Sequence, residues 1–373
     1  MHKIMHTGDI HLDSPFSGLT PRFAETRRGE LRATFTSMMA YAKMNNVDLM
    51  LIAGDVFDSE YVTRETYSLL CREFENFGKP VFITPGNHDP ASRESVWQRY
   101  SFPDNVCVFR DDKLASVDLD GLGGCGVTVY GFGYTSAEMT ECPLVGFSVR
   151  DRDRINLLVC HSEIGVPSTK NCPLSPAQIE VFGADYTALG HIHNPPTPGK
   201  NNRYSYCGCP EPRAFDETGA KGALIVEIDK DGRESHVNIK PVRFSKRRYE
   251  RGEITIDGAA SMTDIDSAVK AFVYENRYGE DTLLSLRLRG YVSPSLVVDT
   301  ESMDGAAYGL YFMKVEDATL PDLDTDALLS DVTIRGEVFR QLKPMLDSSD
   351  EREKEVGRRA LRYAFSALSG ESI

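Results

Sequence analysis

Apolar strands alternate with amphipathic helices over the first 90 residues, and this order constrains the fold more than any other feature of the chain. Residues 47–55, VDLMLIAGD, form a nearly continuous apolar run, which is typical of a strand buried on both faces of a sheet. Similar runs occur at 3–9 and 79–89. Helical periodicity over 28–45 and 63–77 separates the three runs. We therefore predict a layered α/β fold.

Further short apolar or aromatic runs follow, and each is closed by Gly, Pro, His or Asn. They are VTVYGFG (127–133), INLLVCHSE (155–163), YTALGHIH (186–193), RYSYCGCP (203–210) and GALIVEID (222–229). We expect these runs to form strands as well. Polar clusters stand at the ends of several of them, which is where loops converge to bind ligands in open α/β sheets.

The residue composition changes after Val242, and the charged run SKRRYERGE follows shortly after it. We predict a large first domain over 1–245, a smaller α+β capping domain over 246–333, and a C-terminal helical segment over 334–373. The last segment contains an amphipathic pattern typical of a helix. One face of that helix carries Val356, Ala360, Leu361, Ala364, Phe365 and Leu368.

Composition excludes several classes of protein. The formal net charge of −14 argues against a general affinity for nucleic acid, although it does not exclude a local basic groove. The eight cysteines include no CxxC pair, so we expect buried reduced thiols rather than a zinc ribbon or a disulfide framework. No apolar run approaches the roughly 20 residues of a membrane span, and the first residues lack a secretory pattern. We expect a cytoplasmic protein.

Polar motifs recur at the ends of the predicted strands, and five of the eight histidines lie in them. The motifs are Asp9-x-His11, GDVFD with Asp55, GNHD with Asn87 and His88, CHSE with His161, and GHIH with His191 and His193. Each motif alone could be a hydrogen-bonded turn. Together, and at strand ends, they indicate a metal site.

The candidate ligands are carboxylate, amide and imidazole groups without a thiolate. This set suits divalent ions such as Mn, Fe or Zn and disfavours a closed structural zinc site. Seven groups are too many for one ion and fit two ions that share a carboxylate, an arrangement suited to displacement at phosphorus. The predicted ligands are Asp9, His11, Asp55, Asn87, His161, His191 and His193.

Taken together, these motifs resemble the calcineurin-like metallophosphoesterase superfamily. HLDSPF (11–16) and CGCPEPRAFDETGAKGA (207–223) are similar to its SbcD and YhaO branch of bacterial DNA repair exonucleases. The resemblance implies a β-sandwich flanked by helices and two metal ions, most readily Mn. It also implies metal-dependent hydrolysis of phosphodiester bonds in DNA.

The resemblance also implies a role for each residue. Asp9, His11, Asp55 and His193 would hold one ion, and Asp55, Asn87, His161 and His191 would hold the other, with Asp55 bridging. His88 would stabilise the transition state or protonate the leaving oxygen. Asp89 would orient His88. Asp58 departs from the histidine that archaeal and eukaryotic relatives often carry at the end of the second motif.

Three functions remain open at this point. The leading one is a Mn-dependent DNA nuclease. We expect it to dock through its C-terminal segment on an SMC-like ATPase of the SbcC or YhaN type, and a homodimer is a further candidate assembly. The second is a phosphodiesterase or phosphatase acting on small nucleotides or other phosphoesters. The third is a non-catalytic scaffold, which the presence of all seven ligand positions and His88 disfavours.

Two further groups of residues have less specific interpretations. Lys246, Arg247 and Arg248 are candidate DNA contacts, although a charged run at a domain joint is more often a solvated linker. His6 lies inside the first predicted strand, where we expect a core histidine rather than a catalytic one.

Overall fold

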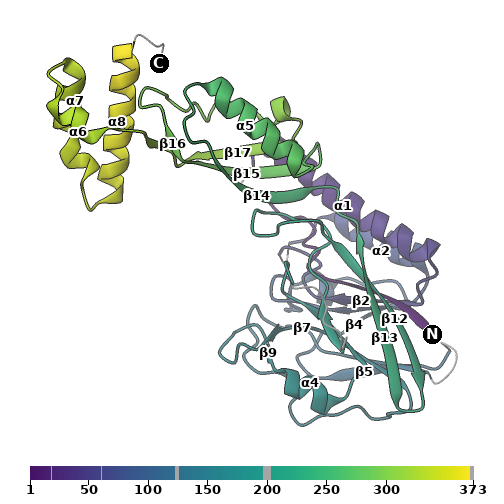
Figure 1. The fold of residues 1–373 in the computed structure, drawn as a ribbon. Helices are drawn as coiled ribbons and strands as arrows, with labels where there is room; N and C mark the ends of the chain where they lie inside the picture. The colour runs from purple at the N-terminus through teal and green to yellow at the C-terminus, as the bar shows by residue number, and fades with distance from the viewer. Residues whose placement is uncertain (18, 60, 122–125, 196–202, 370–373) are drawn as a thin grey trace. The chain divides into compact units, whose positions relative to one another are not determined.

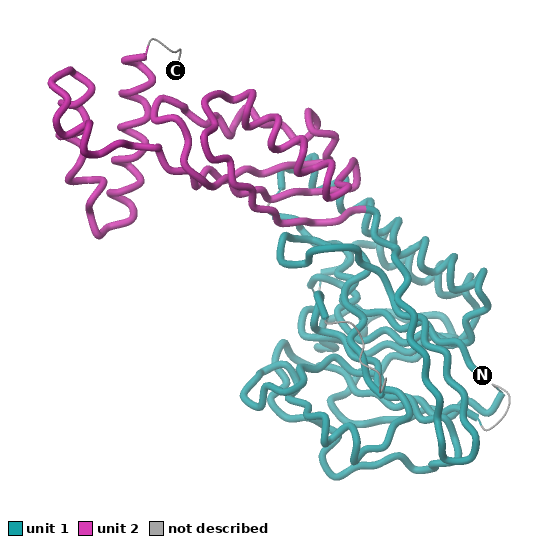
Figure 2. Tube along the Cα trace, in the orientation of Figure 1, with its two compact units in different colours: residues 1–246 teal, residues 247–373 magenta. Residues whose placement is uncertain are grey.

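The computed structural model describes residues 1–17, 19–59, 61–121, 126–195 and 203–369. The chain divides into two compact units, residues 1–246 and 247–373, which are drawn in separate colours in Figure 2.

Unit 1 is built on two sheets, whose labelled strands include β2 and β7 (Figure 1). The first sheet has six strands in the order β13-β12-β1-β2-β3-β4. β1, β2, β3 and β4 are parallel, and β12 runs antiparallel to both β1 and β13. The parallel pairing places the carboxyl ends of β1, β2 and β3 at one edge of the sheet. The bounds are β1 His2–Thr7, β2 Leu49–Ala53, β3 Val81–Thr84, β4 Val106–Val108, β12 Gly222–Asp231 and β13 Glu234–Arg243.

The second sheet has five strands in the order β11-β10-β7-β6-β5. β6, β7, β10 and β11 are parallel and β5 is antiparallel to β6. A short ladder of two strands, β8 with β9, lies outside this sheet. The bounds are β5 Ala115–Leu119, β6 Val127–Gly131, β7 Ile155–His161, β8 Glu163–Ile164, β9 Pro173–Leu174, β10 Tyr186–Gly190 and β11 Tyr204–Tyr206.

A three-layered core holds unit 1 together. Apolar side chains of both sheets, including Leu51 and Leu157, pack between them. The outer face of the first sheet is covered by α1 and α2, whose Phe35 and Phe74 rings meet edge to face. The outer face of the second sheet is covered by α4 and by loop residues from 139 to 149. The helices of the unit are α1 Pro21–Met44, α2 Arg64–Phe77, α3 Val96–Arg99 and α4 Pro176–Phe182.

The predicted α/β fold is confirmed, with a β-sandwich flanked by helices. Every strand predicted from an apolar run in unit 1 is present. The helix predicted to begin near residue 28 instead begins at Pro21, because Arg27 and Glu30 in its first turns are buried as an ion pair and so broke the apolar pattern that we followed. His6 is fully buried and contacts the Tyr186 hydroxyl, which confirms it as a core histidine.

Unit 2 contains a parallel sheet in the order β14-β15-β17 with α5 packed on it, and a ladder of β16 with β18. The bounds are β14 Arg248–Thr255, α5 Met262–Glu275, β15 Thr282–Arg289, β16 Tyr291–Val292, the 3-10 turn Gly305–Tyr308, β17 Phe312–Asp317 and β18 Leu320–Pro321. Gly252 gives β14 room for the Phe272 ring of α5, since a Cβ there would lie 2.5 Å from the ring.

Three helices close unit 2, namely α6 Thr325–Ser330, α7 Ile334–Leu346 and α8 Glu351–Ser369. Leu328 of α6 packs with Phe339, Leu361 and Phe365 in one small core. The helical cluster therefore begins near residue 325 rather than at 334, since α6 contributes to its core. Val356 and Leu368, which we predicted on the apolar face of α8, are about half exposed (51% and 47%).

Two predicted absences can be compared with the part of the chain that the structure describes. There, no helix combines the length and apolar character needed to cross a bilayer. Seven cysteines are free thiols, of which Cys71 and Cys107 are half-buried and the other five are buried. Cys125 lies outside the described residues.

Candidate metal centre

The predicted ligands come together at the carboxyl ends of the strands of unit 1. Asp9 and His11 follow β1, Asp55 follows β2, and Asn87 follows β3. His161 ends β7 of the second sheet, and His191 and His193 follow β10 of that sheet. Because β2 packs against β7 and β10, the two sets of loops meet over the same end of the sandwich.

The first group of ligand atoms belongs to Asp9, His11, Asp55 and His193, and these atoms all lie within 4.8 Å of one another. The Nε2 atoms of His11 and His193 are 3.2 Å apart. Asp55 Oδ2 lies 3.7 Å from His11 Nε2, and Asp9 Oδ1 lies 3.8 Å from His193 Nε2. Three of the four side chains are fully or almost fully buried, and His193 is 22% exposed.

A second group surrounds His161. Its Nε2 lies 2.9 Å from Asn87 Oδ1, 3.3 Å from His191 Nδ1 and 3.4 Å from Asp55 Oδ2. Asp55 Oδ2 is therefore close to both groups. Asp9 is also close to both, because Asp9 Oδ1 lies 3.7 Å from His161 Nδ1.

The donor and acceptor chemistry of these atoms fits bound cations. His193 Nδ1 lies 2.6 Å from a carboxylate oxygen of Glu217, and His11 Nδ1 lies 3.1 Å from one of Asp58. His193 therefore carries its N–H on Nδ1 and turns a lone pair on Nε2 toward His11. His11 Nδ1 forms no hydrogen bond, so its approach to Asp58 does not fix the tautomer of His11. His161 Nδ1 donates to the Ala53 carbonyl at 2.9 Å, so its Nε2 also presents a lone pair, toward Asp55. Several lone pairs thus face one another with no hydrogen between them. A bound divalent ion would accept these lone pairs and remove the repulsion between them.

Strained backbone carries several of these side chains. Asp9, His11 and Asp55 have φ values of 47°, 49° and 49°, and His191 has 106°. Non-glycine residues rarely adopt positive φ, and such strain is held in place only by surrounding structure, often at functional sites. The turns after β1, β2 and β10 thus aim these side chains into the centre.

Glycines in the motifs allow the loops to approach one another. A Cβ on Gly86 would lie 2.1 Å from Asp55 Oδ1, and a Cβ on Gly190 would lie 1.7 Å from the Ala53 carbonyl oxygen. Both distances are far below contact distance. The glycines of GNHD and GHIH are therefore required for the close packing of the loops that carry the ligands.

Burial perturbs the titration of the centre. Burial lowers the pKa of His11 well below its ordinary value, and the nearby Arg213 guanidinium lowers it further. Burial and the neighbouring His161 lower the pKa of His191 to about 4. Burial raises the pKa of Asp9 to about 6, although His193 and His161 oppose the rise. Metal binding needs neutral imidazoles and ionised carboxylates, so the shifts of His11 and His191 favour ligation, whereas the raised pKa of Asp9 opposes it.

Asp89 has a different set of partners from the one we expected. Its Oδ1 accepts from the Gly86 N–H at 2.7 Å, and its Oδ2 accepts from the Val56 and Phe57 N–H groups at 2.9 and 3.2 Å. The expectation that Asp89 orients the His88 ring was therefore wrong, because both carboxylate oxygens are directed to backbone. Asp89 instead joins the loop that carries Asp55 to the loop that carries His88.

His88 itself lies beside the first group. Its N–H donates to Asp55 Oδ1 at 3.0 Å, and its ring meets the His11 ring edge to face with centroids 4.9 Å apart. Unlike the buried ligands, the His88 side chain is exposed. It is thus placed where it can contact a molecule that approaches the centre.

Sequence reasoning missed Arg213 and Glu217. Glu217 contacts His193, and Arg213 pairs with both Asp58 and Glu217. Both residues lie in the segment CGCPEPRAFDETGAKGA, which we noted only for its resemblance. The available signal was the cluster of charged residues in a segment that follows GHIH.

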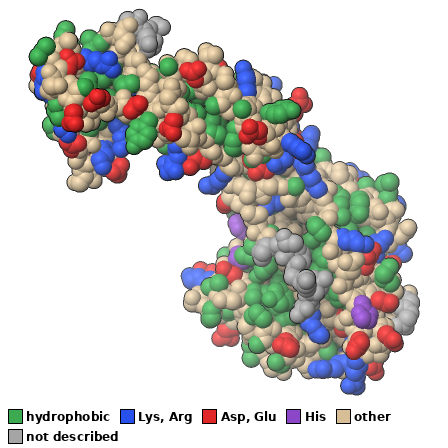
Figure 3. All heavy atoms as spheres, in the orientation of Figure 1, with side chains coloured by type: hydrophobic (Ala, Val, Ile, Leu, Met, Phe, Trp, Pro, Cys, Tyr) green, Lys and Arg blue, Asp and Glu red, His purple; other side chains and the backbone are tan. Residues whose placement is uncertain are grey.

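The candidate DNA contacts already have protein partners. Lys246 Nζ lies 3.4 Å from Glu30 Oε1. The Arg247 guanidinium stacks 3.5 Å above the Tyr311 ring, and Arg248 pairs with Glu250 at 2.7 Å. On the face drawn in Figure 3, basic and acidic side chains are intermixed in both units. The run is therefore engaged with neighbouring side chains and begins β14, and its contact with DNA stays a prediction.

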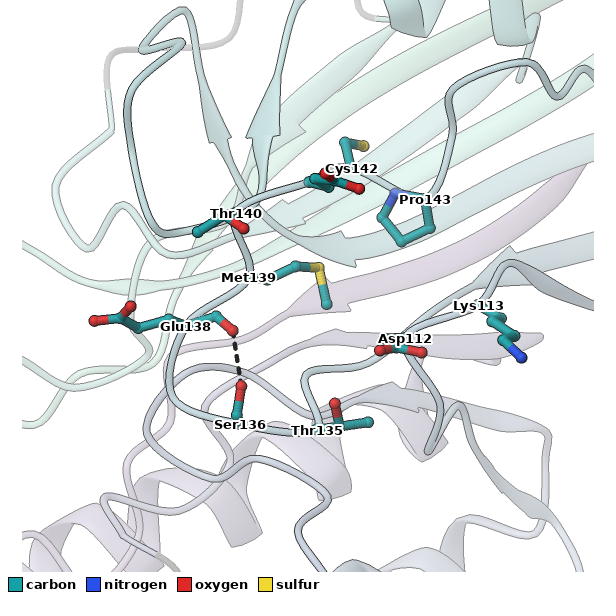
Figure 4. A pocket seen from close by; sticks show the side chains of 10 residues that line it. Asp112, Lys113, Thr135, Ser136, Glu138, Met139, Thr140, Cys142 and Pro143 are labelled. Atoms are coloured by element: carbon teal, nitrogen blue, oxygen red, sulfur yellow. Dashed lines mark hydrogen bonds between the residues drawn. The ribbon is translucent and has the colours of Figure 1, made fainter.

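Two surface pockets of unit 1 lie apart from the ligand set. The pocket in Figure 4 is lined by residues 112, 113, 135, 136 and 138–143, and the second by residues of 141–145 and 165–178. Neither lining includes a predicted ligand. In the first, the Ser136 hydroxyl donates to the Glu138 carbonyl. We assign no role to these pockets.

Comparison with known proteins identifies similar sequences. Residues 2–195 match the calcineurin-like phosphoesterase family model. The uncharacterized metallophosphoesterase YhaO of Bacillus subtilis (strain 168) is 26% identical over 296 residues, 77% of this chain and 68% of that protein. The DNA double-strand break repair protein Mre11 of Aeropyrum pernix is 26% identical over 284 residues, 70% of this chain and 66% of that protein.

A third relative is a subunit of the nuclease SbcCD from Staphylococcus epidermidis. It is 26% identical over 273 residues, 65% of this chain and 70% of that protein. The segment shared with YhaO is longer than the 246 residues of unit 1. The similarity to YhaO therefore extends into unit 2.

Proposed function

Because this chain belongs to the calcineurin-like phosphoesterase family, we propose that it is a DNA nuclease that hydrolyses phosphodiester bonds with two divalent ions, most readily Mn²⁺. The observation that carries the proposal is the position of Asp55, whose carboxylate lies beside both groups of ligands. The names of two relatives, a double-strand break repair protein and a nuclease subunit, support DNA as the substrate.

The residues divide into two ligand sets under this proposal. Asp9, His11, Asp55 and His193 would hold one ion, and Asp55, Asn87, His161 and His191 would hold the other. When bound, such a pair of ions supplies an activated water and neutralises charge on the phosphate. His161 keeps its Nε2 available because its Nδ1 donates to Ala53.

His88 would act on the substrate rather than on the ions. Its exposed ring stands beside His11, and its backbone N–H is fixed by Asp55. A protonated imidazole can give its proton to the leaving oxygen of the broken phosphodiester bond. Asp89 supports this arrangement indirectly, by fixing the loop on which His88 is carried.

The test is a nuclease assay with Mn²⁺ on single-stranded and blunt duplex oligonucleotides, comparing the wild type with His88→Ala. We expect cleavage by the wild type and a loss of about 100-fold or more in His88→Ala, the size typical of a general acid. His236→Ala is the matched control, because His236 is an exposed histidine on β13 and should leave cleavage unchanged.

The outcomes separate the competing functions. Hydrolysis of bis-nitrophenyl phosphate without cleavage of DNA would refute the nuclease and favour a phosphodiesterase acting on small phosphoesters. No hydrolysis of either substrate across neutral pH would refute both enzymes and favour a scaffold. A homodimer stays a prediction, which sedimentation of the purified protein would test.

We also propose that α8 docks on an SMC-like ATPase of the SbcC or YhaN type. The buried side of α8 includes Leu361 and Phe365, while Val356 and Leu368 remain about half exposed (51% and 47%). The exposed apolar residues are thus available to a partner. Deletion from residue 334 would cut through the core that α6 shares, so substitutions are the cleaner experiment.

A double variant, Val356→Glu with Leu368→Glu, should abolish co-purification with the ATPase and leave hydrolysis of bis-nitrophenyl phosphate intact. Tyr274→Glu on α5 is the control, because Tyr274 is 84% exposed in the same unit but lies on another helix. Retained binding in the double variant would contradict the docking proposal.

A further inference from the structure

We infer that Arg213, Asp58 and Glu217 form a bridge that positions His11 and His193 for metal binding. The inference rests on the metal site of the proposed function and adds three positioning residues to it. None of the three is among the seven ligands. The bridge explains why the segment after GHIH carries its charged residues.

Two carboxylates reach the outer nitrogens of the two histidines. Glu217 Oε1 lies 2.6 Å from His193 Nδ1, and Asp58 Oδ1 lies 3.1 Å from His11 Nδ1. Glu217 holds the His193 imidazole with the N–H on Nδ1 and the lone pair on Nε2. Asp58 lies beside His11 Nδ1 without a hydrogen bond to it. A carboxylate behind a ligating histidine fixes the tautomer and the ring orientation and raises the basicity of the ligand.

Arg213 joins the two carboxylates. Its Nη1 contacts Asp58 Oδ1, and its Nη2 lies 3.3 Å from Glu217 Oε1. The exposed fractions of the three side chains are small, at 18% for Asp58, 15% for Arg213 and 6% for Glu217. A guanidinium presents a planar fork of donors, so one side chain can hold two carboxylates at a set separation.

Backbone groups also hold Glu217 and His193 in place. The Arg213 N–H donates to Glu217 Oε2 at 2.5 Å, so Glu217 is fixed by the turn that also carries Arg213. Lys221 Nζ donates to the His193 carbonyl at 3.1 Å. The histidine and the carboxylate that orients it are thus anchored to one segment.

That segment is tied to α1 by a buried ionic cluster. Arg27 donates to Glu211 Oε1 and to the Pro212 carbonyl, each at 2.8 Å. The other oxygen of Glu211 accepts from the Thr34 hydroxyl at 2.9 Å. Because Arg27, Thr34 and Glu211 are buried, the turn before Arg213 has little freedom to move.

Arg213 also affects whether Asp58 can act as a metal ligand. Ligand atoms of His11, Asp58 and His88 lie within 4.8 Å of one another, so Asp58 is close enough to join a competing ligand group. Pairing with Arg213 engages the oxygen of Asp58 that faces His11. We therefore assign Asp58 to the bridge with Arg213 rather than to the ligand set.

The first test measures Mn²⁺ binding by the loss of the free-ion electron paramagnetic resonance signal on titration. We expect two bound ions in the wild type. In Glu217→Gln and Arg213→Gln, one of the two should bind about 10- to 100-fold more weakly, the usual effect of losing a group behind a ligand. Circular dichroism and the thermal midpoint report whether each variant is folded.

The control is Glu227→Gln, which makes the same carboxylate-to-amide change in unit 1. Glu227 accepts from Lys240 at 2.8 Å on the β12–β13 hairpin, apart from the ligands. Its Mn²⁺ binding should equal that of the wild type. An equal loss of affinity in Glu227→Gln and Glu217→Gln would overturn the inference.

Coupling through Arg213 is tested with a double variant, Asp58→Asn with Glu217→Gln. If one bridge links both carboxylates, the fold-loss in affinity of the double variant should be smaller than the product of the two single losses. The inference would be contradicted if the fold-loss in affinity of the double variant equalled the product of the two single losses and Arg213→Gln bound Mn²⁺ like the wild type. Arg213 would then not couple the two carboxylates.

The second readout is the tautomer of His193 in the metal-free protein, from long-range proton–nitrogen spectra of histidine-labelled protein. The wild type should show the proton on Nδ1, and Glu217→Gln should show a mixture of tautomers. An unchanged tautomer would contradict the inference. Failure of the proposed function can be distinguished from failure of this inference. A wild type that binds Mn²⁺ but does not cleave DNA would refute the nuclease and leave the bridge unaffected.

Discussion

Asp89→Asn is expected to destabilise unit 1 through the backbone, because the Asp89 carboxylate joins two loops. The carboxylate accepts three N–H groups, from Gly86, Val56 and Phe57. Asparagine has one oxygen, so its best orientation keeps the Val56 and Phe57 bonds and turns its NH₂ group toward the Gly86 N–H. The variant thus loses one hydrogen bond and leaves two donors facing each other.

The magnitude follows from these contacts. A hydrogen bond to a charged group contributes about 1.5 to 3 kcal/mol, and a buried polar group without a partner costs about 1 to 3 kcal/mol. We expect a loss of about 3 to 5 kcal/mol in the free energy of unfolding. At about 2 to 4 °C per kcal/mol for a unit of this size, the midpoint should fall by roughly 10 °C.

The assay is thermal unfolding followed by calorimetry, with bis-nitrophenyl phosphate hydrolysis measured well below the midpoint. Asp118→Asn on β5 is the control, since Asp118 is 47% exposed and the change there should stay within about 0.5 kcal/mol. If Asp89→Asn keeps the wild-type midpoint and loses only activity, our account of Asp89 as a link between loops is refuted. That result would restore a direct role on His88.

Other predictions concern the fold and its pH dependence. Gly190→Ala should lower the midpoint by several degrees and weaken Mn²⁺ binding, because the new Cβ would lie 1.7 Å from the Ala53 oxygen; wild-type values for both would contradict it. Burial lowers the pKa of His6 to about 3, so the unfolded chain binds a proton below pH 6.5 that the folded chain excludes. Stability should fall from pH 6.5 toward 3 by about 1.4 kcal/mol per pH unit, and His6→Gln should remove that part of the slope in denaturant titrations. Arg362→Met should free α8 for proteolysis, because Arg362 is 7% exposed and donates to the Thr319 carbonyl at 2.6 Å; wild-type resistance to trypsin would refute this anchor.

Much of the architecture followed from local patterns. Runs such as 47–55 are buried on both faces, and their apolar character alone marked them as strands. Parallel strands end at one edge, so the polar residues after them were expected to meet. The beginning of α1 could not be found in this way, because Arg27 is buried by an ion pair rather than by apolar character.

The types and positions of the candidate ligands were also determined by the sequence itself, because GD, GNHD and GHIH motifs place carboxylate, amide and imidazole groups directly after strands. Only the tertiary structure decided which nitrogen of each histidine faces the centre, and it directed Asp89 to backbone N–H groups. It also brought Asp58 to Arg213 across 155 residues of chain. Contacts between residues so far apart leave no periodicity or spacing in a single sequence, so their partners are set by the packing of the two sheets.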